Sequence, residues 1–188
     1  MTSMEYKEAS NIVLSELENT FNVISEDDIE KLIQAVFQAD KVFFVGVGRV
    51  KLSLEAIAKR WAHLGISTFV VGQITEPAIT DSDLLIVGSG SGESLYPLQI
   101  AKKAKEFGAK VLHIGSNAES SMKLYSDFFV RIPVQSKLYL EDEISSKQPM
   151  TSLFEQSLLL LGDVVSLMIV DRKQIVIDNL WQYHANLE

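Results

Sequence analysis

The sequence predicts an α/β protein with a doubly wound, five-stranded parallel sheet flanked by helices. Short apolar runs alternate with helical patterns along residues 41–132, and this alternation is typical of a parallel sheet covered on both faces. Several of these runs end in glycine or serine. In such sheets, ligands bind beyond the carboxyl ends of the strands.

The length and composition indicate one cysteine-free domain. A chain of 188 residues can bury one sizeable core. We expect a single domain over residues 1–188, with N-terminal helices (1–40), a parallel α/β core (41–132), a loop (133–148) and a C-terminal helix and tail (149–188). The formal charge of −8 and the pI of about 4.9 argue against nucleic acids and anionic membranes as partners. The absence of cysteine excludes disulfides, thiolate zinc sites and cysteine nucleophiles.

Hydrophobic periodicity defines the elements. It predicts helices over residues 5–21 and 25–39, the second opened by Ser25 with Asp28 three residues later, as in a capping box. The expected strands are residues 41–45, 67–71, 84–87, 110–114 and 127–132, and the expected helices between them are residues 50–64, 95–107 and 119–125.

The C-terminal part is unusually apolar. Residues 150–170 form an apolar stretch broken by Glu155, Gln156, Gly162 and Asp163, so we predict a buried core helix rather than a membrane span. This stretch and the apolar residues of the following polar tail exceed what one small sheet covers, which predicts a homo-oligomer. The N-terminus is polar and does not resemble a signal peptide, so we expect a cytoplasmic protein.

The most informative loop joins the third predicted strand to a helix. It consists of Ser89, Gly90, Ser91, Gly92, Glu93 and Ser94. Glycines admit a close backbone approach, while serine hydroxyls and the N–H groups of a helix start donate to anions. The alternative for the loop alone is a plain turn with a serine cap.

Two other strands end in similar residues, Gly46-Val47-Gly48 and Gly115-Ser116-Asn117. All three ends should meet at one edge of the sheet, which predicts a ligand site there. The first turn is a poor dinucleotide fingerprint, because its third glycine would fall at Lys51 and no acidic residue closes the second strand.

These motifs resemble the sugar isomerase (SIS) domain family, and within it the 6-phospho-3-hexuloisomerases. The broad resemblance is carried by Gly46-Val47-Gly48-Arg49, Ala62-His63-Leu64-Gly65 and the serine loop. The narrower one is carried by Val70-Val71-Gly72, Pro77-Ala78-Ile79, Gln148-Pro149-Met150, Ser152-Leu153-Phe154-Glu155-Gln156 and the terminal His184-Ala185-Asn186-Leu187-Glu188.

The resemblance implies interconversion of 3-hexulose 6-phosphate and fructose 6-phosphate, the second step of formaldehyde fixation through ribulose monophosphate. It implies no redox cofactor and no metal, a phosphorylated ketohexose as partner, and a homotetramer built as a dimer of dimers. Such an isomerisation needs a base that moves a carbon-bound proton and an acid that shuttles protons between two oxygens.

Three residues are candidates for the proton transfers. Glu155 is the expected base, although a first-turn glutamate could simply complement the helix dipole. His184 could complete a site across a subunit boundary, or be an exposed histidine of the tail. His63, near the end of its predicted helix, ranks third, because a cationic imidazole is favourable there for structural reasons alone.

Other polar residues are assigned to binding or to the core. Gly48 and Arg49 should bind the phosphate or a substrate hydroxyl together with the serine loop; a surface arginine in an ion pair is the alternative for Arg49. Glu93 would repel a phosphate, so we expect it to orient the loop or to face sugar hydroxyls. His113 lies within a predicted strand and should be a hydrogen-bonded core residue.

Several positions depart from the family pattern. Val50 replaces the usual serine and Thr151 the usual glycine, Gln73 and Glu76 also differ, and residues 139–147 are more acidic than an anionic substrate favours. These departures leave two alternatives open: a non-catalytic sugar-phosphate-binding protein, and an SIS isomerase for another sugar phosphate.

Overall fold

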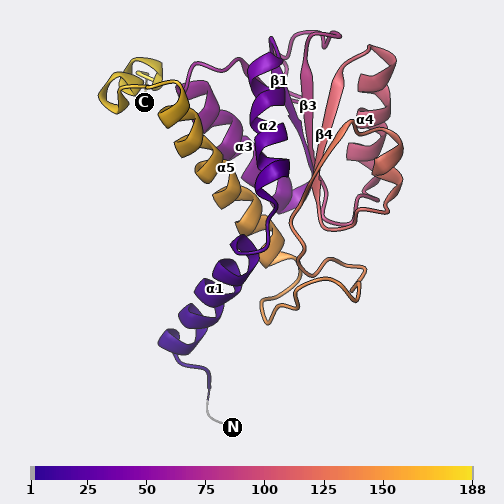
Figure 1. The fold of residues 1–188 in the computed structure, drawn as a ribbon, viewed down its shortest axis with the longest axis vertical. Helices are drawn as coiled ribbons and strands as arrows, with labels where there is room; N and C mark the ends of the chain where they lie inside the picture. The colour runs from indigo at the N-terminus through magenta and orange to yellow at the C-terminus, as the bar shows by residue number, and fades with distance from the viewer. Residues whose placement is uncertain (1–2, 188) are drawn as a thin grey trace.

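In the computed structural model, which describes residues 3–187, five parallel strands form one sheet (Figure 1). Their order across the sheet is β2-β1-β3-β4-β5, so the winding reverses at β1. The strands are β1 (Val42–Val45), β2 (Thr68–Val70), β3 (Leu84–Gly88), β4 (Lys110–Gly115) and β5 (Phe128–Arg131). The predicted doubly wound parallel sheet is therefore confirmed.

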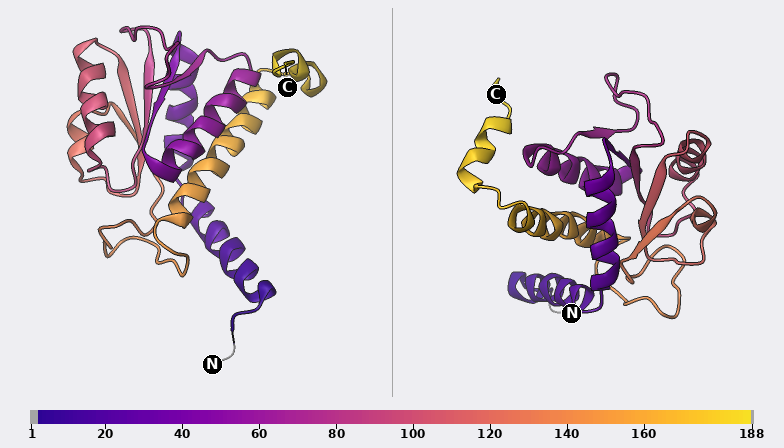
Figure 2. Two further views of the ribbon diagram at one scale, coloured as in Figure 1. Left: turned by 180° about the vertical axis from the view of Figure 1, so that it is seen from behind. Right: turned by 45° about the horizontal axis from the view of Figure 1, so that its top comes forward.

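Helices cover both faces of the sheet, which makes three layers (Figure 2). One face packs against α2 (Glu26–Gln38), α3 (Gly48–His63) and α5 (Ser152–Arg172), and the other against α4 (Leu95–Glu106) and the short 3₁₀ helix η1 (Ser121–Leu124). Alternate residues of β1 enter the two cores: Phe44 lies in the first and Phe43 in the second. Burial on both faces explains why the central strands are continuously apolar.

The first helix, α1 (Tyr6–Phe21), extends away from the body at the lower left of Figure 1 and contacts the start of α5. The capping box predicted for α2 is confirmed, because the backbone N–H of Asp28 donates to Ser25 Oγ at 3.3 Å. Among the described helices, α5 is the one long and apolar enough to span a membrane, and 56% of its apolar window is buried inside the fold. This burial is expected of a core helix.

One expectation about local structure is wrong. Residues 119–125 do not form an α-helix; only the single turn η1 forms, because Met122 is the one buried side chain of this turn and one turn is enough to bury it. Part of the polar tail forms the 3₁₀ helix η2 (Ile177–Tyr183). Ile175 and Leu180 pack against the first core cluster, which fixes this segment beside α3.

Candidate functional site

A cleft of about 230 Å³ lies at the carboxyl ends of β1 and β3, where the winding of the sheet reverses. Its walls come from the turn after β1, the serine loop after β3, the loop after β5 and the start of α5. The lining residues are Val47, Gly48, Arg49, Val50, Gly88, Ser89, Gly90, Ser91, Ser94, Ser136, Lys137, Thr151, Phe154 and Glu155. Most of the predicted binding residues and the predicted base thus meet in one cavity.

The serine loop is closed by its own hydroxyls. Ser89 Oγ accepts the N–H of Gly92 at 3.1 Å, and Ser91 Oγ accepts the N–H of Glu93 at 3.3 Å. Gly92 has a φ of +67°, which favours glycine. Ser94 occupies the N-cap position of α4, but its side chain makes no capping bond. The first-turn N–H groups of α4, which have no acceptor within the helix, are therefore not capped by Ser94, unlike in a plain serine-capped turn.

The end of β4 supports the serine loop from behind. His113, which is buried, lies with Nε2 2.8 Å from the carbonyl oxygen of Ser89. Since a carbonyl only accepts, the imidazole Nε2–H is the donor. Burial lowers the pKa of His113 to about 4, against the opposing effect of that hydrogen bond, so the ring is neutral near pH 7. The prediction that His113 is a hydrogen-bonded core residue is confirmed.

Two more bonds hold the loop, both to the carbonyl oxygen of Gly90. The N–H groups of Ser116 and Asn117 donate to it at 2.9 and 3.1 Å. The loop is thus shaped by the residues that follow β4, and the predicted meeting of these two strand ends is confirmed.

Glu93 ties the serine loop to the start of η1. Its carboxylate accepts the N–H of Ser121 at 2.7 Å. The backbone and side-chain hydrogen bonds of Ser121 lower the pKa of Glu93 against the opposing effect of burial, and the charge of Lys137 makes the smallest of these contributions, also lowering it. Of the two expectations for Glu93, the orienting role has this direct support, and Glu93 does not line the cleft.

Glu155 is buried at the start of α5 and is held by several partners. Arg49 Nε donates to Oε2 in an ion pair, Thr151 Oγ1 donates to Oε1 at 2.9 Å, and Ser53 Oγ donates to the backbone carbonyl at 2.9 Å. This arrangement orients one carboxylate at the wall of the cleft. Arg49 thus lines the cleft and also forms an ion pair. The sequence had offered substrate binding and an ion pair as alternatives for this residue.

The two other catalytic candidates lie elsewhere within this chain. His63 ends α3, whose first turn carries Arg49, and a helix rises 1.5 Å per residue, so the two Cα atoms are about 21 Å apart along the axis. The rings of His63 and His184 stack with centroids 5.4 Å apart, and Trp181 lies 5.3 Å from His184. The histidines therefore meet each other but not the Glu155 of their own chain.

Sequence reasoning missed two residues of the cleft, Ser136 and Lys137. Both lie in the long loop after β5, where no periodicity or glycine pattern marks a ligand contact. The one available signal was the position of the segment, since it follows the carboxyl end of a strand. No group of three or more histidine or acidic side chains within residues 3–187 is arranged to hold a metal ion.

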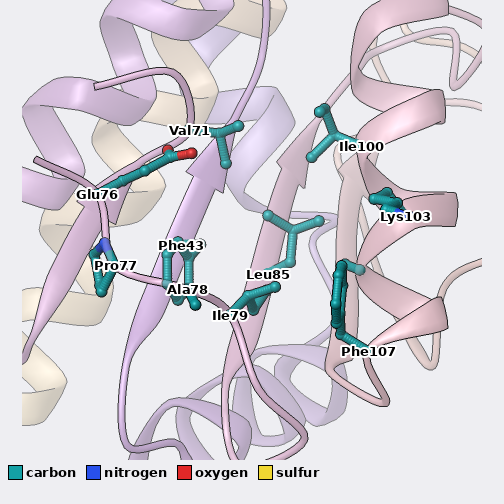
Figure 3. A pocket seen from close by; sticks show the side chains of 11 residues that line it. Phe43, Val71, Glu76, Pro77, Ala78, Ile79, Leu85, Ile100, Lys103 and Phe107 are labelled. Carbon is teal, nitrogen blue, oxygen red and sulfur yellow. The ribbon is translucent and has the colours of Figure 1, made fainter. Parts of the chain in front are cut away.

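A second cavity of about 240 Å³ lies between the sheet and α4, on the face of the sheet that α4 covers (Figure 3). Its walls are largely apolar, with Phe43, Leu85 and Phe107 among them. Its two charged residues are engaged locally: Lys103 pairs with Glu106 at 2.7 Å, and Glu76 accepts the N–H of Gly72 at 2.7 Å. The cleft at the serine loop offers polar donors for an anion, so it is the candidate site.

The sequence matches the SIS domain model over residues 35–161, which takes in the whole sheet and Glu155. The chain belongs to the SIS domain family. It is 35% identical to the 3-hexulose-6-phosphate isomerase of Bacillus subtilis strain 168 over 94% of this chain and 95% of the relative. It is 34% identical to the protein of that name from Mycobacterium gastri, over 95% of this chain and 89% of the relative.

The solved structures agree with this SIS assignment. A Methanococcus jannaschii protein, whose crystal structure was taken to imply 3-hexulose-6-phosphate isomerase function, superposes with a TM-score of 0.83 at 29% identity. The alignment covers 96% of this chain and 99% of that one. The similarity therefore extends beyond the SIS core to the flanking helices.

Two departures from the SIS pattern acquire physical roles in the cleft. Thr151 supplies the hydroxyl that bonds Glu155. The Val50 side chain lies against the strand ends, because a Cβ added at Gly88 would come within 2.8 Å of Val50 Cγ1. One substitution thus adds a polar contact to the buried carboxylate, while the other adds apolar packing.

Proposed function

We propose that this SIS protein is a sugar-phosphate isomerase that interconverts D-arabino-3-hexulose 6-phosphate and fructose 6-phosphate. The observation that carries the proposal is the buried Glu155 carboxylate at the wall of a cleft whose other wall is the serine loop. The names of relatives at about 35% identity over most of the chain support the same reaction. The proposal keeps the cytoplasmic location and the ribulose monophosphate pathway expected from the sequence.

The proposed chemistry moves the keto group from C3 to C2. Glu155 removes the proton from C2 of the 3-hexulose, which gives a 2,3-enediol, and returns it to C3. A second group moves a proton between the oxygens on C2 and C3, so atoms and charges balance without a redox step. Arg49 and Thr151 orient the carboxylate, and Gly48 and the serine loop, from Ser89 to Ser94, hold the phosphate.

The acid is proposed to come from a second copy of the chain. His184 lies with His63 at the far end of α3 from Glu155, so the same chain does not supply both groups to one cleft. A homotetramer built from dimers would bring the C-terminal segment of one copy to the cleft of another. This arrangement also covers apolar side chains near the C-terminus, such as Trp181, which is 73% exposed in the single chain.

A coupled assay for fructose 6-phosphate formed from 3-hexulose 6-phosphate tests the proposal. Glu155→Gln should lower kcat by about a hundredfold or more, the size expected for a lost general base, while fructose 6-phosphate still stabilises the folded variant. Asp163→Asn, on an exposed position of the same helix, should retain wild-type activity. A wild type that binds fructose 6-phosphate without turning over the hexulose would instead favour a non-catalytic sensor or another sugar phosphate.

A further inference from the structure

We propose that Lys137 is the cation that binds the phosphate of the substrate, so that recognition in this protein is shared between the hydroxyl and N–H dipoles of the serine loop and a lysine from the loop after β5. This inference rests on the proposed function, because it assigns a residue to the phosphate that the substrate would carry. Two features of the structure support it: the balance of charged side chains that line the cleft, and the hydrogen bonds that order the turn around Lys137.

The cleft without Lys137 offers no net positive charge. Of its described lining residues, three are charged: Arg49, Glu155 and Lys137. Arg49 and Glu155 form an ion pair with each other, so their charges offset. The serine hydroxyls and backbone N–H groups bring only dipoles, and the whole chain carries a formal charge of −8. Among the described lining residues, Lys137 is therefore the one cation that forms no ion pair and could face a phosphate dianion.

Lys137 lines the same cleft as four residues of the serine loop, and its ammonium is not committed to another ion pair. Its charge contributes, after the hydrogen bonds of Ser121, to the lowered pKa of Glu93 in that loop. None of the ion pairs of residues 3–187 includes Lys137. The lysine thus lies within electrostatic reach of the loop and has its donors available for a ligand.

The turn that carries Lys137 is held by a carboxylate from its own loop. Glu143 Oε2 accepts the N–H groups of Ser136 at 3.0 Å and of Leu140 at 2.9 Å. Ser136 Oγ also accepts the N–H of Leu138 at 3.1 Å. These bonds fix the backbone on both sides of Lys137, so the lysine is presented by an ordered turn.

Two further contacts tie this loop to the body of the protein. Asp142 pairs with Arg131 at 2.5 Å at the end of β5, and Glu16 of α1 accepts the N–H of Lys147 at 2.7 Å. Residues 139–147 are acidic, which is unexpected beside an anionic substrate. Two of their carboxylates, Asp142 and Glu143, hold the loop in place through these contacts.

The test compares Lys137→Met, Lys137→Arg and a matched control, Lys147→Met, which removes the same charge from the other end of the same loop. The first readout is thermal stabilisation by fructose 6-phosphate and by inorganic phosphate, and the second is the KM and kcat for 3-hexulose 6-phosphate. Lys137→Met should raise the KM and the apparent Kd for fructose 6-phosphate by about tenfold or more, as expected for a lost charge-assisted bond, with kcat within about twofold of the wild type.

The remaining outcomes are also decisive. Lys137→Arg should recover most of the affinity, and Lys147→Met should behave as the wild type. Unchanged affinity in Lys137→Met, an equal loss in Lys147→Met, or a wild type stabilised by neither probe would overturn the inference. A wild type that binds fructose 6-phosphate through Lys137 but does not isomerise the hexulose would support the inference while contradicting the proposed isomerase.

Discussion

His113 illustrates at the scale of one residue how the core shapes the site. The side chain is buried in β4, its ring lies 5.0 Å from that of Phe129, and Nε2–H donates to the carbonyl of Ser89. A charged imidazole is disfavoured in this place by desolvation, so the neutral ring is both a core side chain and a fixed donor to the serine loop. Protonation of this ring should therefore act on the stability of the whole fold.

The free energy of unfolding should fall between about pH 6.5 and about pH 4 because of His113. The pKa is about 4 in the folded protein against 6.5 ordinarily. Within this window the unfolded chain binds the extra proton, so stability decreases as the pH falls, by about 2 kcal/mol between about pH 7.5 and about pH 5. Urea unfolding at about pH 7.5 and about pH 5 measures this loss, and His113→Gln, which keeps an N–H donor, should lack it.

Three carboxylates with lowered pKa values, Glu16, Glu93 and Asp127, do not reduce the stability in this pH window. Burial raises the pKa values of Glu16 and Asp127, but their hydrogen bonds and nearby lysines together lower these values further than burial raises them. The hydrogen bonds of Ser121 lower the pKa of Glu93. The stability that they contribute is present above their ordinary pKa values and is lost only as the pH falls below these. Equal losses in the wild type and in His113→Gln between pH 6.5 and about pH 5 would show that His113 is not the titrating group.

At the scale of elements, the serine loop and the end of β4 form one packed unit. A Cβ added at Gly92 would lie 2.0 Å from Ser120 Oγ and 3.2 Å from His113 Cε1. His113 belongs to β4, and Ser120 follows that strand in the chain. Ser120 and His113 are themselves buried. There is therefore no room for a side chain at position 92 unless the serine loop or Ser120 moves.

Gly92→Ala should destabilise the protein by about 3 kcal/mol, since it combines a steric clash with a left-handed backbone. It should also abolish stabilisation by fructose 6-phosphate, because the loop must shift. Gly65→Ala is the matched control: its φ is +79°, but the nearest atom to an added Cβ is Tyr183 Oη at 3.8 Å, so backbone strain alone should cost about 1 kcal/mol. Similar losses in both variants, measured by urea unfolding, would contradict the packing argument.

The strands were predicted correctly from the sequence, whereas one helix and part of the cleft were not. All five strands were predictable, because buried parallel strands are continuous apolar runs between helical segments. The helix expected over residues 119–125 did not form, since the single turn η1 already buries Met122, its one fully buried side chain. Glu155, Arg49 and most of the serine loop could be singled out from the sequence as residues of the cleft. Lys137 could not, because its place depends on bonds within an irregular loop, such as that from Ser136 N–H to Glu143.

At the scale of the whole molecule, the length of α3 separates two halves of the proposed chemistry. Arg49 and Glu155 lie at one end of this helix, and His63 and His184 lie at the other. The segment around His184 also exposes large side chains, with Trp181 at 73% and Tyr183 at 51%. Both facts favour an assembly in which this segment packs on another copy, as the apolar residues of the tail already suggested in the sequence. What the sequence did not indicate is that His63 and His184 lie side by side.

Co-expression of two inactive variants tests this assembly directly. Glu155→Gln and His184→Ala should each lose about a hundredfold in kcat. If one cleft takes Glu155 from one copy and His184 from another, a hybrid dimer carries one doubly altered site and one intact site. Random pairing then restores about a quarter of the wild-type activity. A mixture no more active than its two components would place both groups in one chain or remove His184 from the chemistry, and sedimentation of the wild type as a monomer would exclude the shared site altogether.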